Sequence, residues 1–438
     1  MQESWTIKVD WEEPLDSGSP EERTCFAALG IRADDVWLTE GSDALANRLR
    51  QAPLLSAYHL AEWIAWNWWR LRWEPRSQAK DWAYAHRVAT IGSGYIWPNL
   101  TIFSDGERTA LMAKPTGERP QTPFRYIADR VAVVPASKFE TEVDVFVDQV
   151  LERLDWAKVV DSNLEKIWLG ILEERKTPEL ARARKLEALL GQDPDESDPR
   201  IIDQLAADAK RLSVSAVDEL AAEHGQSSKI VTVDELRAIA GNSGFVSAPK
   251  NVVHVPAISK LRRGGQIPAW RLGAEAAQAL RVQERLDGDP ITDKRLAEMA
   301  GVKPLILNDR RGAPSISFAL DESPMRGRVV LRSKWHGGRR FELARLLGDR
   351  LVAAEAGRLF PATRAYTYRQ KMQRSFAAEL LSPFEAVDAM LEDDYSNERQ
   401  QDIAEHFEVS PLTIRTLLVN HGRLEREELD GEFEVAAA

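Results

Sequence analysis

The first 155 residues switch repeatedly between the two-residue period of strands and the three- to four-residue period of helices. Apolar and polar side chains alternate from Trp5 to Trp11, which predicts a strand. Asp105 and Gly106 separate two apolar runs and are typical of a hairpin turn, because both tolerate positive φ. The pattern also predicts helices over Pro53 to Trp73 and Phe139 to Leu154, and strands over Leu100 to Phe103, Thr109 to Met112 and Arg130 to Val134. We therefore expect a mixed α+β domain at residues 1–155.

Tryptophan is concentrated in this domain, where six of the 14 tryptophans lie between Trp63 and Trp82. Aromatic residues at helical spacing usually belong to a core, and tryptophan is large enough to close a small α+β layer. The alternative is an exposed aromatic groove for a nucleotide, a base or a peptide, which would need interleaved Lys and Arg. Arg70, Arg72, Arg76 and Lys80 supply such charges. We favour the core and keep the groove as an alternative.

Residues 156–255 combine helical periodicity with many charges, and an acidic loop interrupts them at Gln192 to Pro199. We expect a helical connecting region here, with short helices over Arg200 to His224 and Val233 to Ala240. The pattern sharpens from Pro256 onward. It predicts helices over Trp270 to Leu286, Ile291 to Val302, Arg339 to Ala354 and Thr367 to Leu381, and strands over Ser315 to Leu320 and Arg328 to Leu331. The whole chain is therefore expected to be α+β in at least two lobes.

Composition supports a folded chain of several units. Its 438 residues are roughly three times a typical domain, which predicts two to four folding units. The single cysteine, Cys25, excludes an internal disulfide framework and a cysteine-rich zinc module. The start of the chain lacks the features of a signal peptide, and the apolar stretch from Leu54 to Leu71 is too short and too charged to span a bilayer. We expect a cytoplasmic protein without a membrane partner.

Charge is spread unevenly around the net value of −11. Residues 260–350 hold 19 Lys and Arg against 11 Asp and Glu, whereas residues 392–438 hold 4 against 13. The basic stretch could meet an acidic partner, and the acidic tail should repel a phosphate backbone.

Sequence motifs for catalysis and cofactor binding are absent. The seven histidines contain no pair at i,i+4 spacing, and the chain has neither a G-x-S-x-G motif nor a glycine-rich phosphate loop with a Walker lysine. We therefore expect no metal and no other cofactor.

Three segments, in order, resemble the signatures of one known family. Residues 340–349, RFELARLLGD, resemble the active-site helix R-F-x-x-A-H-E-L-G-H of the ImmA/IrrE metallo-endopeptidases. Residues 370–383, QKMQRSFAAELLSP, are similar to the second signature, E-x-x-A-N-x-F-A-A-E-L-L-x-P, and residues 403–415 to the helix-turn-helix-like unit that follows it. The resemblance implies a zincin-like domain at residues 256–390 and a helix-turn-helix-like acidic segment at 391–438. It also implies a bacterial origin.

The family's functional positions are all replaced in this chain. The resemblance puts Arg345 and Asp349 at the two zinc-binding histidines, Leu346 at the general-base glutamate and Gln370 at the third ligand. An arginine cannot ligate a cation, and a leucine cannot accept a proton. Arg345 and Asp349 are four residues apart, so they could instead form an ion pair. We favour a buried pair over two solvent-exposed charges, because the family places this face inward.

These replacements predict a non-catalytic pseudo-peptidase that recognises a protein partner in a bacterial stress, phage-control or toxin–antitoxin system. Active relatives act on helix-turn-helix repressors, so a repressor or a toxin is the expected kind of partner. One interpretation places the partner on a basic rim beside an edge strand, a natural place for an extended peptide to pair. The rim includes Arg310, Arg311, Arg326, Arg328, Arg332, Lys334, Arg339 and Arg340, with Arg326, Arg328, Arg332, Arg339 and Arg340 as the proposed partner-binding residues. The other interpretation is that these arginines are scattered solvated charges that only keep the domain soluble.

Two alternatives remain. The first is a zinc metallo-endopeptidase with unusual ligands that cleaves a repressor. The second is a DNA-binding regulator that uses the basic stretch at 260–350; the helix-turn-helix-like tail contributes few bases to such a role, so binding to nucleic acid is possible but not favoured.

Overall fold

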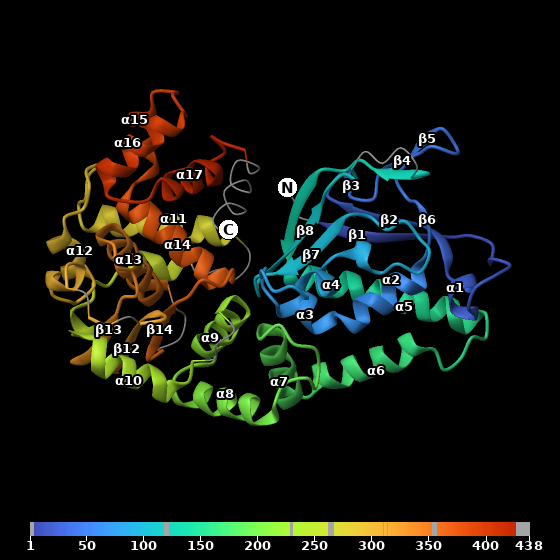
Figure 1. The fold of residues 1–438 in the computed structure, drawn as a ribbon, viewed down its shortest axis with the longest axis horizontal. Coiled ribbons are helices and arrows are strands. Elements are labelled where there is room, and N and C mark those ends of the chain that lie inside the picture. The colour runs from blue at the N-terminus through green and yellow to red at the C-terminus, as the bar shows by residue number, and fades with distance from the viewer. Residues whose placement is uncertain are drawn as a thin grey trace. The chain divides into compact units, whose positions relative to one another are not determined.

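The computed structural model describes residues 4–117, 122–227, 231–261, 267–309, 311–312, 314–352 and 357–425. Its contacts divide the chain into two compact units (Figure 1). Unit 1 comprises Met1–Gln204 with His224–Ser228 and Ala365–Thr367, and unit 2 comprises the rest. Helices and antiparallel strands occur in both units, which confirms the mixed α+β class.

The described residues of unit 1 form three small antiparallel sheets. The first has the order β1-β2-β3, with β6 also paired to β2, the second β10-β8-β7 and the third β5-β4-β9. The strands are β1 (Trp5–Trp11), β2 (Phe26–Ala33), β3 (Val36–Trp37), β4 (Gly41–Asp43), β5 (Arg48–Arg50), β6 (Leu54–Ser56), β7 (Leu100–Ser104), β8 (Arg108–Ala113), β9 (Phe124–Tyr126) and β10 (Arg130–Pro135). The predicted strand at Trp5 to Trp11, the hairpin around Asp105 and the strand from Arg130 are therefore confirmed.

The helices of unit 1 are α1 (Pro20–Thr24), α2 (Ala57–Trp66), α3 (Trp68–Trp73), α4 (Trp82–His86), α5 (Ala136–Trp156), α6 (Asn163–Lys176) and α7 (Pro178–Leu189). The single helix predicted from Pro53 to Trp73 is wrong in two places. Residues 54–56 form β6 instead, because they pair with β2. The helix is then interrupted at Asn67, whose side-chain amide donates to the carbonyl of Trp63.

The tryptophan cluster belongs mainly to the core of unit 1, as favoured from the sequence. Trp68 is buried, stacks on Phe139 at 6.2 Å and meets Trp168 edge-on at 5.6 Å. Trp66 is the exception, with 58% of its surface exposed. The neighbouring arginines are engaged inside the unit, Arg70 with Glu74 and Arg72 with Glu140. Base stacking needs free cations beside exposed rings, so this arrangement does not favour the groove.

Unit 2 is built around one four-stranded antiparallel sheet of order β11-β13-β12-β14. Its strands are β11 (Phe245–Ser247), β12 (Ser317–Ser323), β13 (Arg326–Val330) and β14 (Leu359–Ala362). Its helices are α10 (Val233–Ser243), α11 (Ala269–Gln283), α12 (Asp293–Met299), α13 (His336–Val352), α14 (Tyr368–Leu381), α15 (Phe384–Leu391), α16 (Asn397–Phe407) and α17 (Pro411–Asn420). Helices α8 (Pro199–Arg211) and α9 (Val214–Ser227) each cross the boundary between the units.

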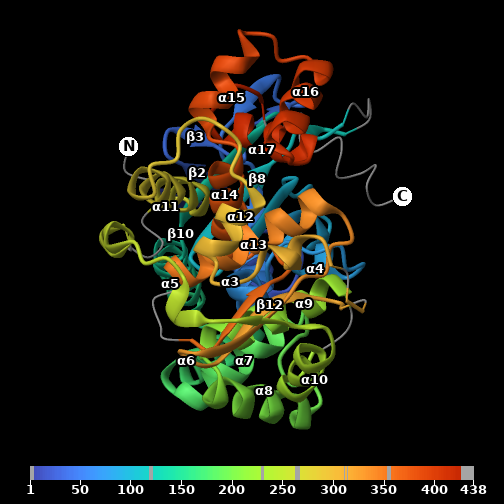
Figure 2. The same cartoon turned by 90° about the vertical axis from the view of Figure 1, so that its left-hand side faces the viewer.

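Helices cover both faces of this sheet (Figure 2). One face packs against α13, through side chains such as Ala319 and Val329. The other packs against α9 and α10, where Phe318 and Val330 join the core that contains Leu236. The predicted elements from Trp270 to Leu381 are confirmed within one to three residues, except that the predicted end at Ala354 lies outside the described residues.

Two glycines allow α11, α13 and α14 to approach closely. A Cβ on Gly348 would lie 2.4 Å from the ring of Phe376, and a Cβ on Gly273 would lie 2.4 Å from the carbonyl oxygen of Met372. Both distances are far below van der Waals contact, so any larger residue would push the helices apart. This packing fixes how α13 and α14 present side chains to each other.

Gly348→Ala is expected to destabilise the protein by about 1–3 kcal/mol, because the added methyl group overpacks the contact with Phe376. Gly241→Ala is the matched control, since a Cβ at this helical position in α10 would meet nothing within 4 Å. It should stabilise by up to about 1 kcal/mol through helix propensity. Urea denaturation gives the free energy of unfolding of both variants, which should fall for Gly348→Ala and rise for Gly241→Ala. Equal changes would contradict the close packing.

Within the part of the chain that the structure describes, no helix is both long enough and apolar enough to cross a membrane.

Candidate functional site

The four positions to which the resemblance draws attention lie together inside unit 2. Arg345, Leu346 and Asp349 lie on the buried side of α13, and Gln370 reaches them from α14. The residues are 7%, 1%, 0% and 0% exposed, respectively. The sequence-based expectation that this helix face points inward is confirmed.

The predicted ion pair between Arg345 and Asp349 is wrong, although both side chains are buried. Nη2 of Arg345 donates to the carbonyl of Thr363 at 2.7 Å and to Oε1 of Gln370 at 2.6 Å. Asp349 accepts two hydrogen bonds of 2.7 Å from Nε and Nη2 of Arg369. Arg345 and Asp349 do not pair with each other, because α14 and the segment after β14 supply hydrogen-bond partners for both.

The surroundings of Arg345 disfavour its charge. Burial lowers the pKa of its guanidinium to about 9, and the positive charges of Arg374 and Arg332 act in the same direction. Glu342 and Asp349 oppose this effect. Arg345 therefore remains a cation at neutral pH, held mainly by neutral oxygens.

This set of side chains does not fit a zinc ion. Of the four, Asp349 alone offers the carboxylate, imidazole or thiolate that zinc prefers, and both of its oxygens accept hydrogen bonds from Arg369. A buried guanidinium one turn away would also repel the metal.

The same network closes the free edge of the sheet along β14. The carbonyl of Pro361 accepts bonds of 3.0 Å from the side-chain amides of Gln370 and Gln373. The backbone N–H of Thr363 donates to Gln370, and its carbonyl accepts from Arg345. Pro361 itself has no N–H to offer, as is common in edge strands. The edge strand expected among the arginines of residues 310–340 is wrong, because β12 and β13 both lie inside the sheet, between β11 and β14.

The five arginines expected to bind a partner differ in their burial and in their contacts. Arg339 and Arg340 are buried, so their assignment to a partner surface is corrected. Arg339 donates to the carbonyls of Ile306, Ser333 and Asp309, which gives it a structural role. Arg326 is exposed and pairs with Glu322, Arg332 lies 3.6 Å from Glu342, and Arg328 donates to the carbonyl of Gly244. Arg310 lies outside the described residues.

Sequence reasoning missed Arg369 and Gln373, which complete the network. Gln373 lies three residues after Gln370, so the two amides share one face of α14. That spacing was a usable signal. Arg369 carried no such signal, because its partner Asp349 lies on another helix.

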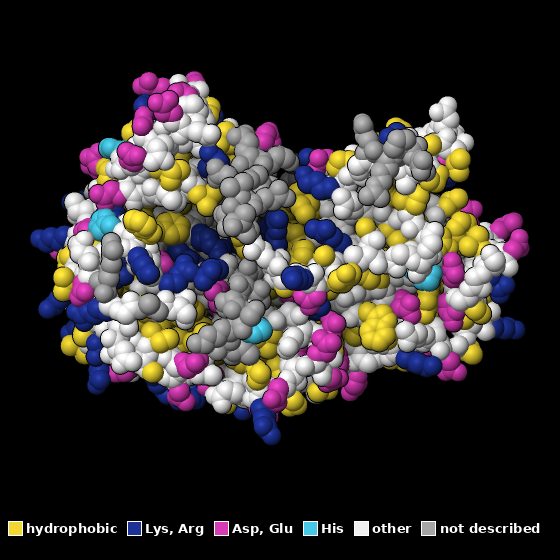
Figure 3. Space-filling view, viewed as in Figure 1, with side chains coloured by type: hydrophobic (Ala, Val, Ile, Leu, Met, Phe, Trp, Pro, Cys, Tyr) yellow, Lys and Arg dark blue, Asp and Glu magenta, His cyan; other side chains and the backbone are white. Residues whose placement is uncertain are grey.

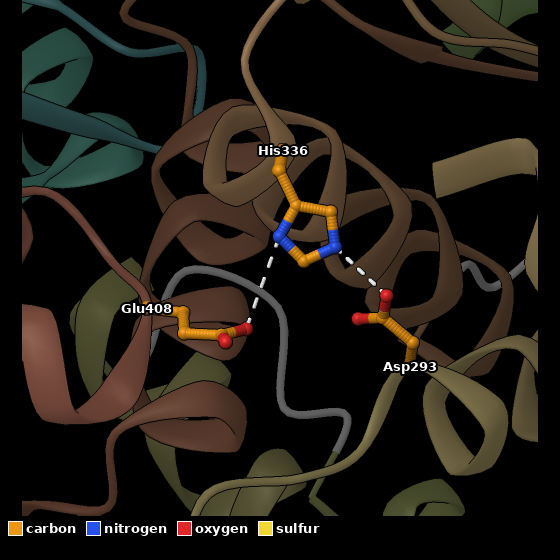
Figure 4. A group of neighbouring side chains, drawn as sticks. All are labelled: Asp293, His336 and Glu408. Carbon is orange, nitrogen blue, oxygen red and sulfur yellow. Dashed lines mark hydrogen bonds and ion pairs between the residues drawn. The ribbon is translucent and has the colours of Figure 1, made fainter. Parts of the chain in front are cut away.

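A second polar cluster joins residues that are distant in sequence (Figure 4). His336, at the start of α13, lies 2.8 Å from a carboxylate oxygen of Asp293 and 3.9 Å from one of Glu408. Arg340 contacts the same two carboxylates at 2.5 and 3.3 Å. Burial alone would raise the pKa of Asp293, but the hydrogen bonds from His336 and Arg340 outweigh it and lower this pKa below its usual range.

The C-terminal helices form a small three-helix unit, α15 to α17, with its own core around Phe407 and Leu418. Ser410 caps α17 by accepting from the backbone N–H of Thr413. In Figure 3, Asp and Glu side chains gather over α15 and α16. The described arginines of this segment are engaged locally, Arg399 with the carbonyl of Met390, Arg415 with Asn397 and Arg423 with Asp388. This charge distribution does not favour a DNA reader, and the tail beyond residue 425 lies outside the described residues.

Comparisons of the chain with family models, with curated proteins and with solved structures found no match. The resemblance to the ImmA/IrrE peptidases consequently rests on the three sequence motifs.

Proposed function

We propose that the protein is a non-catalytic recognition or regulatory protein that derives from an ImmA/IrrE-like peptidase and acts by binding another protein. The observation that carries this proposal is the network of Arg345, Gln370 and Gln373. Arg345 and Gln370 stand where the resemblance implies metal ligands, and the network binds the backbone groups of Pro361 and Thr363. A peptidase needs these positions for metal and general base, and needs an accessible edge for its substrate.

The experimental test separates binding from cleavage. The tagged full chain is used to capture proteins from its native host with and without EDTA. We expect the partner to elute intact and in equal amount in both cases, because nothing in the network requires a metal. Elemental analysis of the protein, purified without chelator, should give far less than one zinc per chain.

A variant supplies the matched control. Arg345→His, Leu346→Glu, Asp349→His and Gln370→Glu together rebuild the ligand set that the resemblance implies. If α13 and α14 retain the geometry of a zinc site, the combined variant should bind about one zinc per chain. Stoichiometric zinc in the unaltered protein, with cleavage of the captured partner, would overturn the proposal and favour the peptidase alternative.

A further inference from the structure

His336 lies between two carboxylates that come from different parts of unit 2. Its Nε2 is 2.8 Å from Asp293, the first residue of α12, and its Nδ1 is 3.9 Å from Glu408, the residue that ends α16 (Figure 4). The side chains of His336 and Glu408 are 38% and 53% exposed, so protons can exchange with solvent.

The charge state of the ring decides how many of these contacts it can make. A carboxylate only accepts hydrogen bonds, and a neutral imidazole carries one N–H. The neutral ring can therefore donate to one of the two acids. The imidazolium form has two N–H groups and a positive charge, so it can attract both.

Arg340 makes the group suited to a proton and unsuited to a metal ion. The side chain of Arg340 is 2% exposed, and its guanidinium lies within 3.3 Å of both carboxylates and already supplies a positive charge between them. The two nitrogens of His336 also face different acids, whereas an imidazole binds a metal through one nitrogen. When the ring of His336 is neutral, the positive charge of Arg340 balances only one of the two carboxylates. Protonated His336 supplies a second positive charge, which balances the other carboxylate.

The contact lies where the three-helix unit meets the rest of unit 2. A Cβ on Gly337 would lie 2.8 Å from the carbonyl oxygen of Glu408, so the start of α13 touches the turn between α16 and α17 directly. Val409, the next residue of that turn, packs against both the main core of unit 2 and the core of the three-helix unit. Glu408 itself adopts a left-handed conformation, with φ of 53°.

We propose that His336 is a proton-controlled latch that fastens the α16–α17 turn to the start of α13. The charged groups that face it are Asp293 from α12, Arg340 from α13 and Glu408 from α16. Protonation of His336 adds a favourable contact, so the latch is strong at mildly acidic pH and weakens as the pH rises. The three-helix unit is then released more often at alkaline pH, independently of any partner or peptidase function.

Hydrogen exchange of the full chain, followed by mass spectrometry in the presence of EDTA, tests the latch. The unaltered protein and His336→Gln are compared at the same pH, so that intrinsic exchange chemistry cancels. At about pH 6 we expect the peptides over Glu408 to exchange three- to fivefold more slowly in the unaltered protein, as for an ion pair of about 1 kcal/mol. At about pH 8.5 the two proteins should exchange alike.

Two further variants complete the design. Glu408→Gln removes one acid and should abolish the dependence on pH, whereas His254→Gln, an exposed histidine elsewhere in unit 2, should change nothing. Peptides of α14 report that each variant remains folded. Equal exchange of the unaltered protein and His336→Gln at both pH values would overturn the latch. So would binding of one zinc, titrated as the metal alone without EDTA, that His336→Gln abolishes.

Discussion

Arg369→Met is expected to destabilise the protein by about 3–5 kcal/mol. Asp349 is completely buried, and Arg369 donates to both of its carboxylate oxygens at 2.7 Å. Methionine keeps the length of the side chain but removes these donors, so the variant buries an uncompensated negative charge. The free energy of unfolding, measured by urea denaturation at neutral pH, gives the effect.

The control for this variant is Arg374→Met on the same helix, because Arg374 is half-buried and its hydrogen bond to the carbonyl of Arg364 is exposed to solvent. It should cost less than about 1 kcal/mol. Adding Asp349→Asn to Arg369→Met removes the buried charge and should recover much of the loss. A cost below about 1 kcal/mol for Arg369→Met alone would contradict the assignment, since it would mean that Asp349 finds another partner.

The elements that the sequence predicts well are those whose signals are local. The apolar stripe of Val143, Phe146, Val147 and Val150 predicted α5, and all four side chains are buried. Thr292 and Gly301 bracket α12 as an N-cap and a positive-φ stop. Caps and periodicity act within a few residues, so they survive without knowledge of the tertiary structure.

Predictions failed where a distant segment decided the local structure. Residues 54–56 have helical periodicity but become a strand because β2 offers a partner for their backbone. The same dependence on distant segments limits how much of the candidate site the sequence can predict. The resemblance implied that Arg345 and Asp349 face inward, but their partners Gln370 and Arg369 come from α14 and were not assigned to them. Arg339 was assigned to a partner surface because of its charge alone. It is buried instead, where it donates to the carbonyls of Ile306 and Ser333.

Several arginines of this protein are therefore buried, although arginine usually lies on the surface. Arg339, Arg340 and Arg345 lie inside unit 2 and satisfy backbone carbonyls and acids that would otherwise be unpaired. Its planar guanidinium can serve several acceptors at once, which suits such positions. The basic charge counted in this part of the sequence consequently overstates the positive surface available to a partner.

Unit 1 contains an equally buried network centred on Glu74, which ends α3. Its carboxylate accepts from Nε of Arg70 at 2.7 Å and lies 2.9 Å from Nε2 of His86. Nδ1 of His86 lies 2.7 Å from the carbonyl of Ile102, and because a carbonyl only accepts, this nitrogen carries a proton. Arg70, Glu74 and His86 are 5%, 2% and 0% exposed, so solvent cannot replace a lost partner.

Glu74→Ala should therefore destabilise the protein by about 3–5 kcal/mol, because it leaves the buried His86 without its acid and Arg70 with only the more exposed Asp193 and Asp81. Glu140→Ala is the matched control, since the side chain of Glu140 is 30% exposed and also pairs with an arginine, Arg72. It should cost less than about 1 kcal/mol. Equal losses for Glu74→Ala and Glu140→Ala in thermal or urea unfolding would show that the network around Glu74 adds nothing beyond a surface ion pair.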